Sequence, residues 1–176
     1  MFKKRFLIVL FLTIPILLLS PTSFTEQKKS FENLLDRLKK KEQIGLIVID
    51  GMAMLYRLEL GDAVKSGEDI KIKEVNREVA KQMRILAEIA RKQNIPVLIT
   101  NQVYSEFLSE DELRKGVKKE MNIVGGDLFK YWSKCIIELK NEKGKKKAVL
   151  LKHRSMPQKE MAFEIKERGV FKRGMF

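Results

Sequence analysis

The sequence has 176 residues, of which 44% are hydrophobic, and these values predict one globular domain with a sizeable core rather than a disordered chain. The formal net charge is +13, and residues 113–176 carry 18 basic and 7 acidic side chains, so the basic excess lies in the last third. The single cysteine and single histidine exclude a disulfide framework, a cysteine-based zinc site and a multi-histidine metal centre within one chain.

The first twenty residues imitate a secretory signal peptide. Basic residues at positions 3–5 precede an apolar run over residues 6–19, which is shorter than the about 20 residues of a membrane span. No small-residue cleavage site follows the run. The alternative is a buried parallel strand at residues 16–19, preceded by a leader at residues 1–15 that is signal-like or an artefact. We adopt this alternative because of the segments that follow.

Helices and strands alternate in the first half of the chain. Ser23 and Glu26 have the spacing of a capping box, which predicts the start of a helix. In chain order, the periodicity predicts this helix up to residues 39–41, a strand at 46–49, a polar stretch at 61–68, a helix at about 74–93 and a strand at 96–102. This order indicates a parallel sheet with right-handed crossovers.

The second half of the chain predicts shorter elements. Residues 105–122 are charged without a single period, which indicates a long functional loop, and Gly125 and Gly126 open a short helix through Trp132. Three strands are expected at residues 136–139, 148–151 and 162–165, and the short link at 141–145 favours an antiparallel extension of the sheet. Cys135 lies in an apolar run, which predicts a small buried side chain.

Polar residues stand at the ends of two of the predicted parallel strands. Asp50 follows the strand at 46–49, and Thr100, Asn101 and Gln102 end the strand at 96–102. An acid at such an edge can hold Mg²⁺ directly or through water, and an amide can sense a phosphate by hydrogen bonding. The alternative is that these residues only end strands and form turns. Because both strands are expected to end at the same edge, we favour a functional site.

A phosphate-binding loop is missing from the sequence. Such a loop needs the pattern Gly-x-x-x-x-Gly-Lys-Ser/Thr so that backbone N–H groups can surround a phosphate. The only Gly-Lys pair is Gly144-Lys145, which is followed by Lys146 and has Leu139 at the earlier glycine position. The chain therefore lacks the loop that grips a nucleotide.

Several segments, taken together and in order, resemble the archaeal RadB family of RecA-like recombinases. They are residues 21–27 (Pro-Thr-Ser-Phe-Thr-Glu-Gln), 44–60 around Leu-Ile-Val-Ile-Asp, 97–105 (Val-Leu-Ile-Thr-Asn-Gln-Val-Tyr-Ser), 125–133, 151–157 and 163–170. The resemblance implies an α/β fold, with a RecA-like, mostly parallel sheet flanked by helices and an antiparallel C-terminal hairpin extension. It also implies that the N-terminal part of the core is missing, so residues 16–176 would be a partial RecA-like ATPase domain lacking the phosphate loop.

The resemblance also implies roles for individual residues. Asp50 matches the acid of the Walker B strand and would hold Mg²⁺ through water, while Asn101 and Gln102 would contact the nucleotide. ATP and Mg²⁺ are thus the cofactors implied for the full-length family, and none is expected on this chain alone. No catalytic residue is assigned. Arg57 matches the start of a first DNA-binding region.

Further DNA-binding candidates lie in the basic last third. They are Arg114, Lys115, Lys118 and Lys119 in the charged loop, and Lys145, Lys146 and Lys147 in the hairpin. The charged loop also holds five acids, Glu106, Glu110, Asp111, Glu112 and Glu120, so it is not net basic. A basic segment can attract nucleic acid, anionic lipid or an acidic partner, or it can be a solvated lysine-rich surface.

Three functions remain in competition. The first is a cytoplasmic DNA repair and homologous recombination accessory protein, ATP-dependent in its full-length form, whose partners are single- or double-stranded DNA and a recombinase of the same superfamily. The second is a basic α/β module that binds nucleic acid or a recombinase without nucleotide. The third is a membrane-anchored or exported basic protein, supported by residues 1–20 alone. We expect the first function, without a membrane partner.

Overall fold

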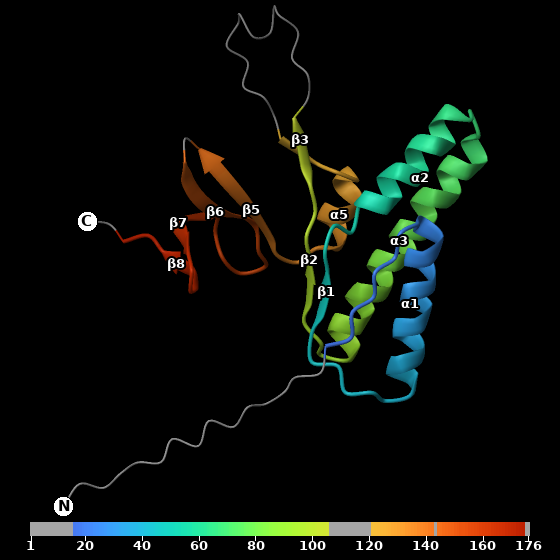
Figure 1. The fold of residues 1–176 in the computed structure, drawn as a ribbon, viewed down its shortest axis with the longest axis horizontal. Helices are drawn as coiled ribbons and strands as arrows, with labels where there is room; N and C mark the ends of the chain where they lie inside the picture. Colours follow the sequence, from blue (N-terminus) through green and yellow to red (C-terminus); the bar gives the residue numbers. More distant parts are fainter. Residues whose placement is uncertain (1–15, 106–120, 143, 175–176) are drawn as a thin grey trace, which may run out of the picture.

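The computed structural model describes residues 16–105, 121–142 and 144–174 (Figure 1). The described elements form a mixed α/β fold, as the sequence predicts. The helices are α1 (Phe24–Lys39), α2 (Met54–Lys65), α3 (Asp69–Lys92) and α5 (Gly126–Trp132), and the strands are β1 (Ile47–Ile49), β2 (Val97–Ile99), β3 (Val103–Ser105), β4 (Met121–Ile123), β5 (Ile136–Glu142), β6 (Lys145–Lys152), β7 (Lys159–Lys166) and β8 (Gly169–Lys172).

Helix α1 begins at the predicted N-cap. The Glu26 backbone N–H donates to Ser23 Oγ at 3.2 Å, which is one half of the expected capping box. The other half differs, because the Glu26 carboxylate accepts from the N–H and the hydroxyl of Thr22, at 2.7 and 2.8 Å. These hydrogen bonds, led by the one from the Thr22 backbone, hold the pKa of Glu26 below its ordinary value.

The end of helix α2 overlaps the stretch at 61–68 that the sequence predicts as polar and non-helical. The helix continues past Gly61 and ends at Lys65. Gly67, which has a φ of +70°, then turns the chain into α3. Tertiary packing explains the difference, because Ala63 is fully buried and the Tyr56 hydroxyl donates to Asn76 of α3 at 2.7 Å. Packing of this kind outweighs the weak helix propensity of a single glycine.

Helix α3 follows the predicted apolar stripe. Its buried positions include Val75, Val79, Met83 and Leu86, which the sequence periodicity selects. The helix ends where Asn94 adopts a left-handed φ of +54°, two residues before Pro96. The expected helix at 74–93 is thus confirmed at its C-terminus, while its N-terminus lies five residues earlier, at Asp69.

Strands β1 and β2 form a short parallel pair, joined through α2 and α3. Ile47 lies opposite Val97, and Ile49 lies opposite Ile99. Figure 1 shows α1, α2 and α3 on one side of this pair. The core beneath these helices combines side chains from α1, α3, β1 and α5, among them Phe31, Leu86, Ile47 and Phe129. The carboxyl ends of both strands therefore meet at one edge.

Two strands described between β2 and α5 form a second small sheet. The predicted strand at 96–102 stops at Ile99, and a separate strand, β3, begins at Val103 and pairs antiparallel with β4. The break is fixed locally, because Asn101 Oδ1 accepts from the Gln102 N–H at 2.9 Å. Most of the expected loop at 105–122 lies outside the described residues, and its two described ends belong to β3 and β4.

The C-terminal strands form an antiparallel sheet in the order β5-β6-β7-β8. The three predicted strands are confirmed as β5, β6 and β7, and the sequence misses β8. Among the described residues this sheet is not hydrogen-bonded to β1 and β2, so the expected single, mostly parallel sheet is replaced by three separate sheets. A hydrogen bond of 2.7 Å from Lys152 Nζ to the Lys130 carbonyl ties the sheet to α5.

Two other expectations are wrong. Residues 16–19 form no strand, and their apolar side chains are exposed. Buried parallel strands need neighbours on both faces, and the described part of the chain supplies none to these residues. Cys135 is also exposed, because it stands in the turn between α5 and β5 rather than inside a strand.

Candidate functional site at the strand ends

The ends of β1 and β2 are joined by the Thr100 hydroxyl. Thr100 Oγ1 donates to Asp50 Oδ1 and accepts from the Gly51 N–H at 2.8 Å. The backbone continues the pairing, because the Thr100 N–H donates to the Ile49 carbonyl at 2.9 Å and the Met52 N–H donates to the Thr100 carbonyl at 3.2 Å. The expected convergence of the two strand ends is thus seen, and it holds one carboxylate oxygen of Asp50 in a fixed position.

Asn101 and Gln102 differ in what they contact. The Asn101 side chain is part-buried, and its Nδ2 donates to the Val124 carbonyl at 2.9 Å. The Gln102 backbone carbonyl accepts from the Val124 N–H at 3.0 Å, while the residue itself is exposed. The Asn101 amide therefore connects the strand end to the start of α5, and Gln102 presents its side chain at the surface.

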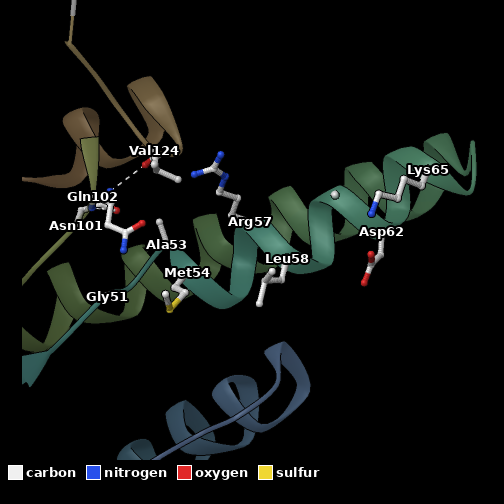
Figure 2. Close-up of a pocket in the computed structure, with 11 residues that line it drawn as sticks. Gly51, Ala53, Met54, Arg57, Leu58, Asp62, Lys65, Asn101, Gln102 and Val124 are labelled. Carbon is white, nitrogen blue, oxygen red and sulfur yellow. Dashed lines mark hydrogen bonds between the residues drawn. The ribbon is translucent and has the colours of Figure 1, made fainter. Parts of the chain in front are cut away.

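A cavity of about 340 Å³ lies beside these strand ends. One wall comes from α2 and its N-terminal turn, and the other comes from Asn101, Gln102 and Val124. Figure 2 shows the Arg57 guanidinium extending across the cavity toward Val124, with Asp62 and Lys65 further along α2. The α2 residues that line it are Met54, Arg57, Leu58, Gly61, Asp62 and Lys65. Gly51 also lines the cavity, so the turn after Asp50 forms part of its wall.

The donor set at Asp50 suits a hydrated Mg²⁺ ion. Mg²⁺ keeps several waters and is commonly held by one or two carboxylates together with substrate phosphates. Asp50 is exposed, and one of its two carboxylate oxygens accepts from Thr100 Oγ1. Among the described residues no group of three His, Cys, Asp or Glu side chains forms a complete metal site. The described residues therefore fit an ion that phosphates help to hold.

The predicted DNA-binding residues fall into three places. Arg57 lines the cavity, whereas Arg114, Lys115, Lys118 and Lys119 lie outside the described residues. The three lysines of β6 do not form one cluster, because successive residues of a strand point to opposite faces. Lys145 and Lys147 share one face, where Lys147 Nζ lies 3.8 Å from Glu142 and 3.4 Å from Glu160, and Lys146 points to the other face.

Sequence reasoning missed two features of this site. One is the Thr100 hydroxyl, whose contact with Asp50 depends on the register of β1 and β2. The other is the α2 wall of the cavity, including Lys65. The spacing of Met54, Leu58, Gly61 and Lys65 is helical, and it indicates one helix face as soon as the glycine is allowed inside a helix.

The fold and the strand-end residues define a class of protein. Parallel strands that carry polar residues at their carboxyl edge are typical of α/β domains that bind ligands outside that edge. Comparison with known proteins gives the family: the model of the Rad51 family matches residues 22–173. The chain belongs to the Rad51 family, which supports a RecA-like fold.

Curated relatives within this family carry the name "DNA repair and recombination protein RadB". The protein from Methanosphaera stadtmanae is 35% identical over 88% of this chain and 61% of its own length. The protein from Methanobrevibacter smithii is 38% identical over 88% and 62%, and one from Methanococcus maripaludis is 37% identical over 88% and 63%. The resemblance to RadB proteins is therefore confirmed, and the chain spans about three fifths of the length of these relatives.

The cellular location of the protein is a separate question. Within residues 16–105, 121–142 and 144–174, the structure contains no helix that is long and apolar enough to cross a membrane. The expected cytoplasmic location rests on the names of the relatives, and it stays a prediction.

Proposed function

We propose that this chain acts in DNA repair and homologous recombination as a RadB-type accessory protein, and that the full-length form associates with DNA in an ATP-dependent way. The observation that carries the proposal is the joined strand edge, where the Thr100 hydroxyl contacts the Asp50 carboxylate and Gln102 is exposed two residues further along the chain. The names of the relatives, all RadB proteins, support the same function.

The strand edge supplies distinct roles to its residues. Asp50 would orient the waters of a Mg²⁺ ion, and the ion would neutralise phosphate charge when bound. Thr100 holds the carboxylate by a hydrogen bond from its hydroxyl to one of the two oxygens, Oδ1. Gln102 would hydrogen-bond to the terminal phosphate and pass its presence to β3, which begins at the next residue. Asn101 positions this strand end through Val124.

The cavity beside the edge would receive the phosphate backbone of DNA. Arg57 and Lys65 line it with one acid, Asp62, so its walls carry a positive balance. Arginine and lysine contacts to phosphate give affinity without sequence preference, and they weaken as salt rises. This arrangement supports association with single- or double-stranded DNA and offers no determinant of base specificity.

A second candidate concerns the 176-residue chain by itself. Its sequence has no phosphate-binding loop, whose backbone N–H groups supply most contacts to the nucleotide. We therefore infer that this chain alone binds DNA or a recombinase of the same superfamily as a basic module that needs no nucleotide. A membrane-anchored or exported protein is the third candidate, and cell fractionation separates it from the other two.

DNA binding measured with and without Mg-ATP tests the first two candidates. We expect this chain to bind a short DNA by salt-dependent contacts that Mg-ATP leaves unchanged, and to bind no ATP in calorimetry. Micromolar ATP binding would show a phosphate site elsewhere in the chain. The Arg57→Gln variant should weaken DNA binding and lower the log–log salt slope by about 0.7 to 0.9. Arg84→Gln, at an exposed position of α3, is the matched control.

A further inference from the structure

The loop between β6 and β7, residues 153–158, is closed by the side chain of the only histidine in the sequence. His153 Nδ1 accepts hydrogen bonds from the backbone N–H groups of Ser155 and Met156, both at 3.1 Å. The Ser155 hydroxyl lies 3.4 Å from the same nitrogen. An acceptor that reaches backbone donors two and three residues ahead folds the chain back on itself, as Asn and Asp side chains do in turns.

These contacts determine the protonation state of the ring. A neutral imidazole has one donor nitrogen and one acceptor nitrogen, whereas both nitrogens are donors in the charged form. Because His153 Nδ1 accepts from two N–H groups, it carries no proton, and the ring proton of the closed loop is on Nε2. The Ser155 hydroxyl is then a donor to Nδ1 as well. The closed loop therefore requires a neutral imidazole in a single tautomer.

The charged groups around the loop disfavour a further cation at this position. The cations at this end of the sheet are Lys130 of α5, Lys134 before β5, Lys152 and Arg154 on either side of His153, and Lys159 at the start of β7. The acids of α5, β5 and β7 are already paired, because each lies between 2.9 and 3.8 Å from a lysine nitrogen. Strand β6 carries no acid. The described surroundings thus offer a charged ring like charges and no unpaired carboxylate.

The ends of the loop are held without the histidine. The antiparallel pairing of β6 with β7 reaches Leu150 and Lys159, and Gln158 Nε2 donates to the Leu151 carbonyl at 3.5 Å. The contacts of His153 lie within residues 153–156, so they require no other part of the protein. Loss of these contacts would therefore release the tip of the loop and leave the two strands paired.

We propose that His153 is a proton-sensitive lock on the tip of this loop. A proton taken from solvent binds Nδ1 and converts the acceptor into a donor. The N–H groups of Ser155 and Met156 then lose their acceptor and turn to water, so the tip opens as the pH falls through the titration of the ring. The tip closes again as the pH rises and Nδ1 releases its proton.

The lock controls a part of the surface that the strand edge and the cavity do not include. The side chains of Arg154, Ser155 and Met156 are exposed around the half-buried imidazole. Opening the tip therefore changes how these side chains are presented at one end of the C-terminal sheet. This inference does not depend on the proposed function, because none of its contacts involves Asp50 or Arg57.

Nuclear magnetic resonance of the intact, nitrogen-15-labelled chain tests the first step. Because the chain has a single histidine, its ring nitrogens give unambiguous signals. We expect the neutral ring to be the tautomer with its proton on Nε2. We also expect a coupling through the hydrogen bond between Nδ1 and the Met156 amide, which disappears when the ring is charged. A neutral ring with its proton on Nδ1 would overturn the proposal.

Amide hydrogen exchange in the parent and in His153→Asn tests the opening of the tip. An asparagine oxygen accepts from the same backbone N–H groups and does not titrate, so this variant should stay closed at every pH. The intrinsic effect of pH on exchange is the same in both proteins, and the ratio of their Met156 exchange rates therefore reports the lock alone. We expect this ratio to be constant above the titration of the ring and to rise as the pH falls through it. A ratio that stays constant across the titration would show that the imidazole only lies beside the turn, and the proposal would be wrong.

His153→Ala removes the acceptor at every pH and completes the comparison. Its Met156 amide should exchange faster than that of His153→Asn, by a factor that does not change with pH. Val79, a fully buried residue of α3, is the control, and its amide should exchange equally in all three proteins at a given pH, which shows that the fold is intact. An alanine variant whose Met156 amide is as protected as that of the parent at high pH would contradict the lock.

Discussion

The side-chain amides of Gln27 and Gln82 hydrogen-bond to each other inside the core, with 2.8 Å between Gln27 Nε2 and Gln82 Oε1. Both residues are buried, and Gln82 is fully so. Gln27 Nε2 also lies 3.8 Å from the sulfur of Met52, which stands two residues after Asp50. The pair therefore connects α1, α3 and the turn that follows the acid of the strand edge.

Breaking this pair on one side should destabilise the fold. In Gln82→Leu, the buried Gln27 amide loses its oxygen acceptor and keeps only the weakly accepting sulfur of Met52, and a buried polar group left without a good partner costs about 1–3 kcal/mol. We expect the free energy of unfolding, measured by urea denaturation, to fall by that amount. Lys81→Leu, at the exposed neighbouring position, is the control and should stay near the parent value.

The double variant Gln27→Leu/Gln82→Leu distinguishes a hydrogen-bond effect from a packing effect. Removing both polar groups eliminates the unsatisfied amide, so stability should recover most of the loss seen in Gln82→Leu. A double variant whose loss equals the sum of the two single losses would show that the pair is not coupled.

The Glu26 cap predicts a pH dependence of stability. Hydrogen bonds from Thr22, first from its backbone, lower the pKa of Glu26 from its ordinary value of 4.5, so the folded state binds the proton less readily. The contribution is fully present above pH 4.5 and is lost as the pH falls through the lowered folded-state pKa. Glu26→Gln should reduce the thermal midpoint at neutral pH and leave it nearly unchanged at strongly acidic pH. Glu32→Gln, later in α1, is the control for losing a carboxylate of the same helix outside the cap.

Replacing Gly125 and Gly61 with alanine should change the stability of the fold in opposite directions. Gly125 has a φ of +80°, and an added Cβ would overlap the ring of Phe129. We expect Gly125→Ala to cost about 1–3 kcal/mol from backbone strain, with the overlap adding to it. Gly61 lies inside α2 with open space at its Cβ position, so Gly61→Ala should stabilise the fold by about 0.5–1 kcal/mol. Thermal melts of the two variants measure both effects, and a destabilised Gly61→Ala would mean that α2 is distorted at this point.

Sequence reasoning predicts the elements whose local signals agree with their packing. The stripe through Val75, Val79, Met83 and Leu86 has one period and one buried face, and it indicates the helix correctly. Helix α2 escapes prediction because its glycine disfavours a helix locally, and the burial of Ala63 outweighs this preference. The separation of the sheets depends on long-range pairing, which periodicity does not encode.

The candidate site is predictable in outline. Apolar strands ending in Asp50 and Thr100 point to one edge, since parallel strands end together, and the structure shows that edge. The partner of Asp50 is not predictable, because a shift of one residue in the register of β2 would turn Thr100 to the other face. Arg57 is a candidate through the family resemblance alone, and its place in the cavity wall follows from the missed helix.

The last prediction concerns Asp50 in a chain extended at its N-terminus with the phosphate-loop segment of a RadB relative. Asp50→Asn should lower ATP turnover by about 100-fold or more, because it removes the negative charge that would orient hydrated Mg²⁺ and phosphoryl transfer depends on such positioning. The fold should remain, because an asparagine oxygen still accepts from Thr100 Oγ1. ATPase rate and thermal midpoint are measured together.

Thr100→Val distinguishes the effect of the negative charge of Asp50 from the effect of the position of its carboxylate. Valine removes the hydroxyl that contacts both Asp50 and the Gly51 N–H, so the carboxylate keeps its charge but loses its anchor. Turnover should then fall less than in Asp50→Asn, and raising Mg²⁺ should recover part of the rate in Thr100→Val alone. If Asp50 only ends a strand, its replacement by another good turn residue would leave both rate and midpoint normal, and the Walker B assignment would be wrong.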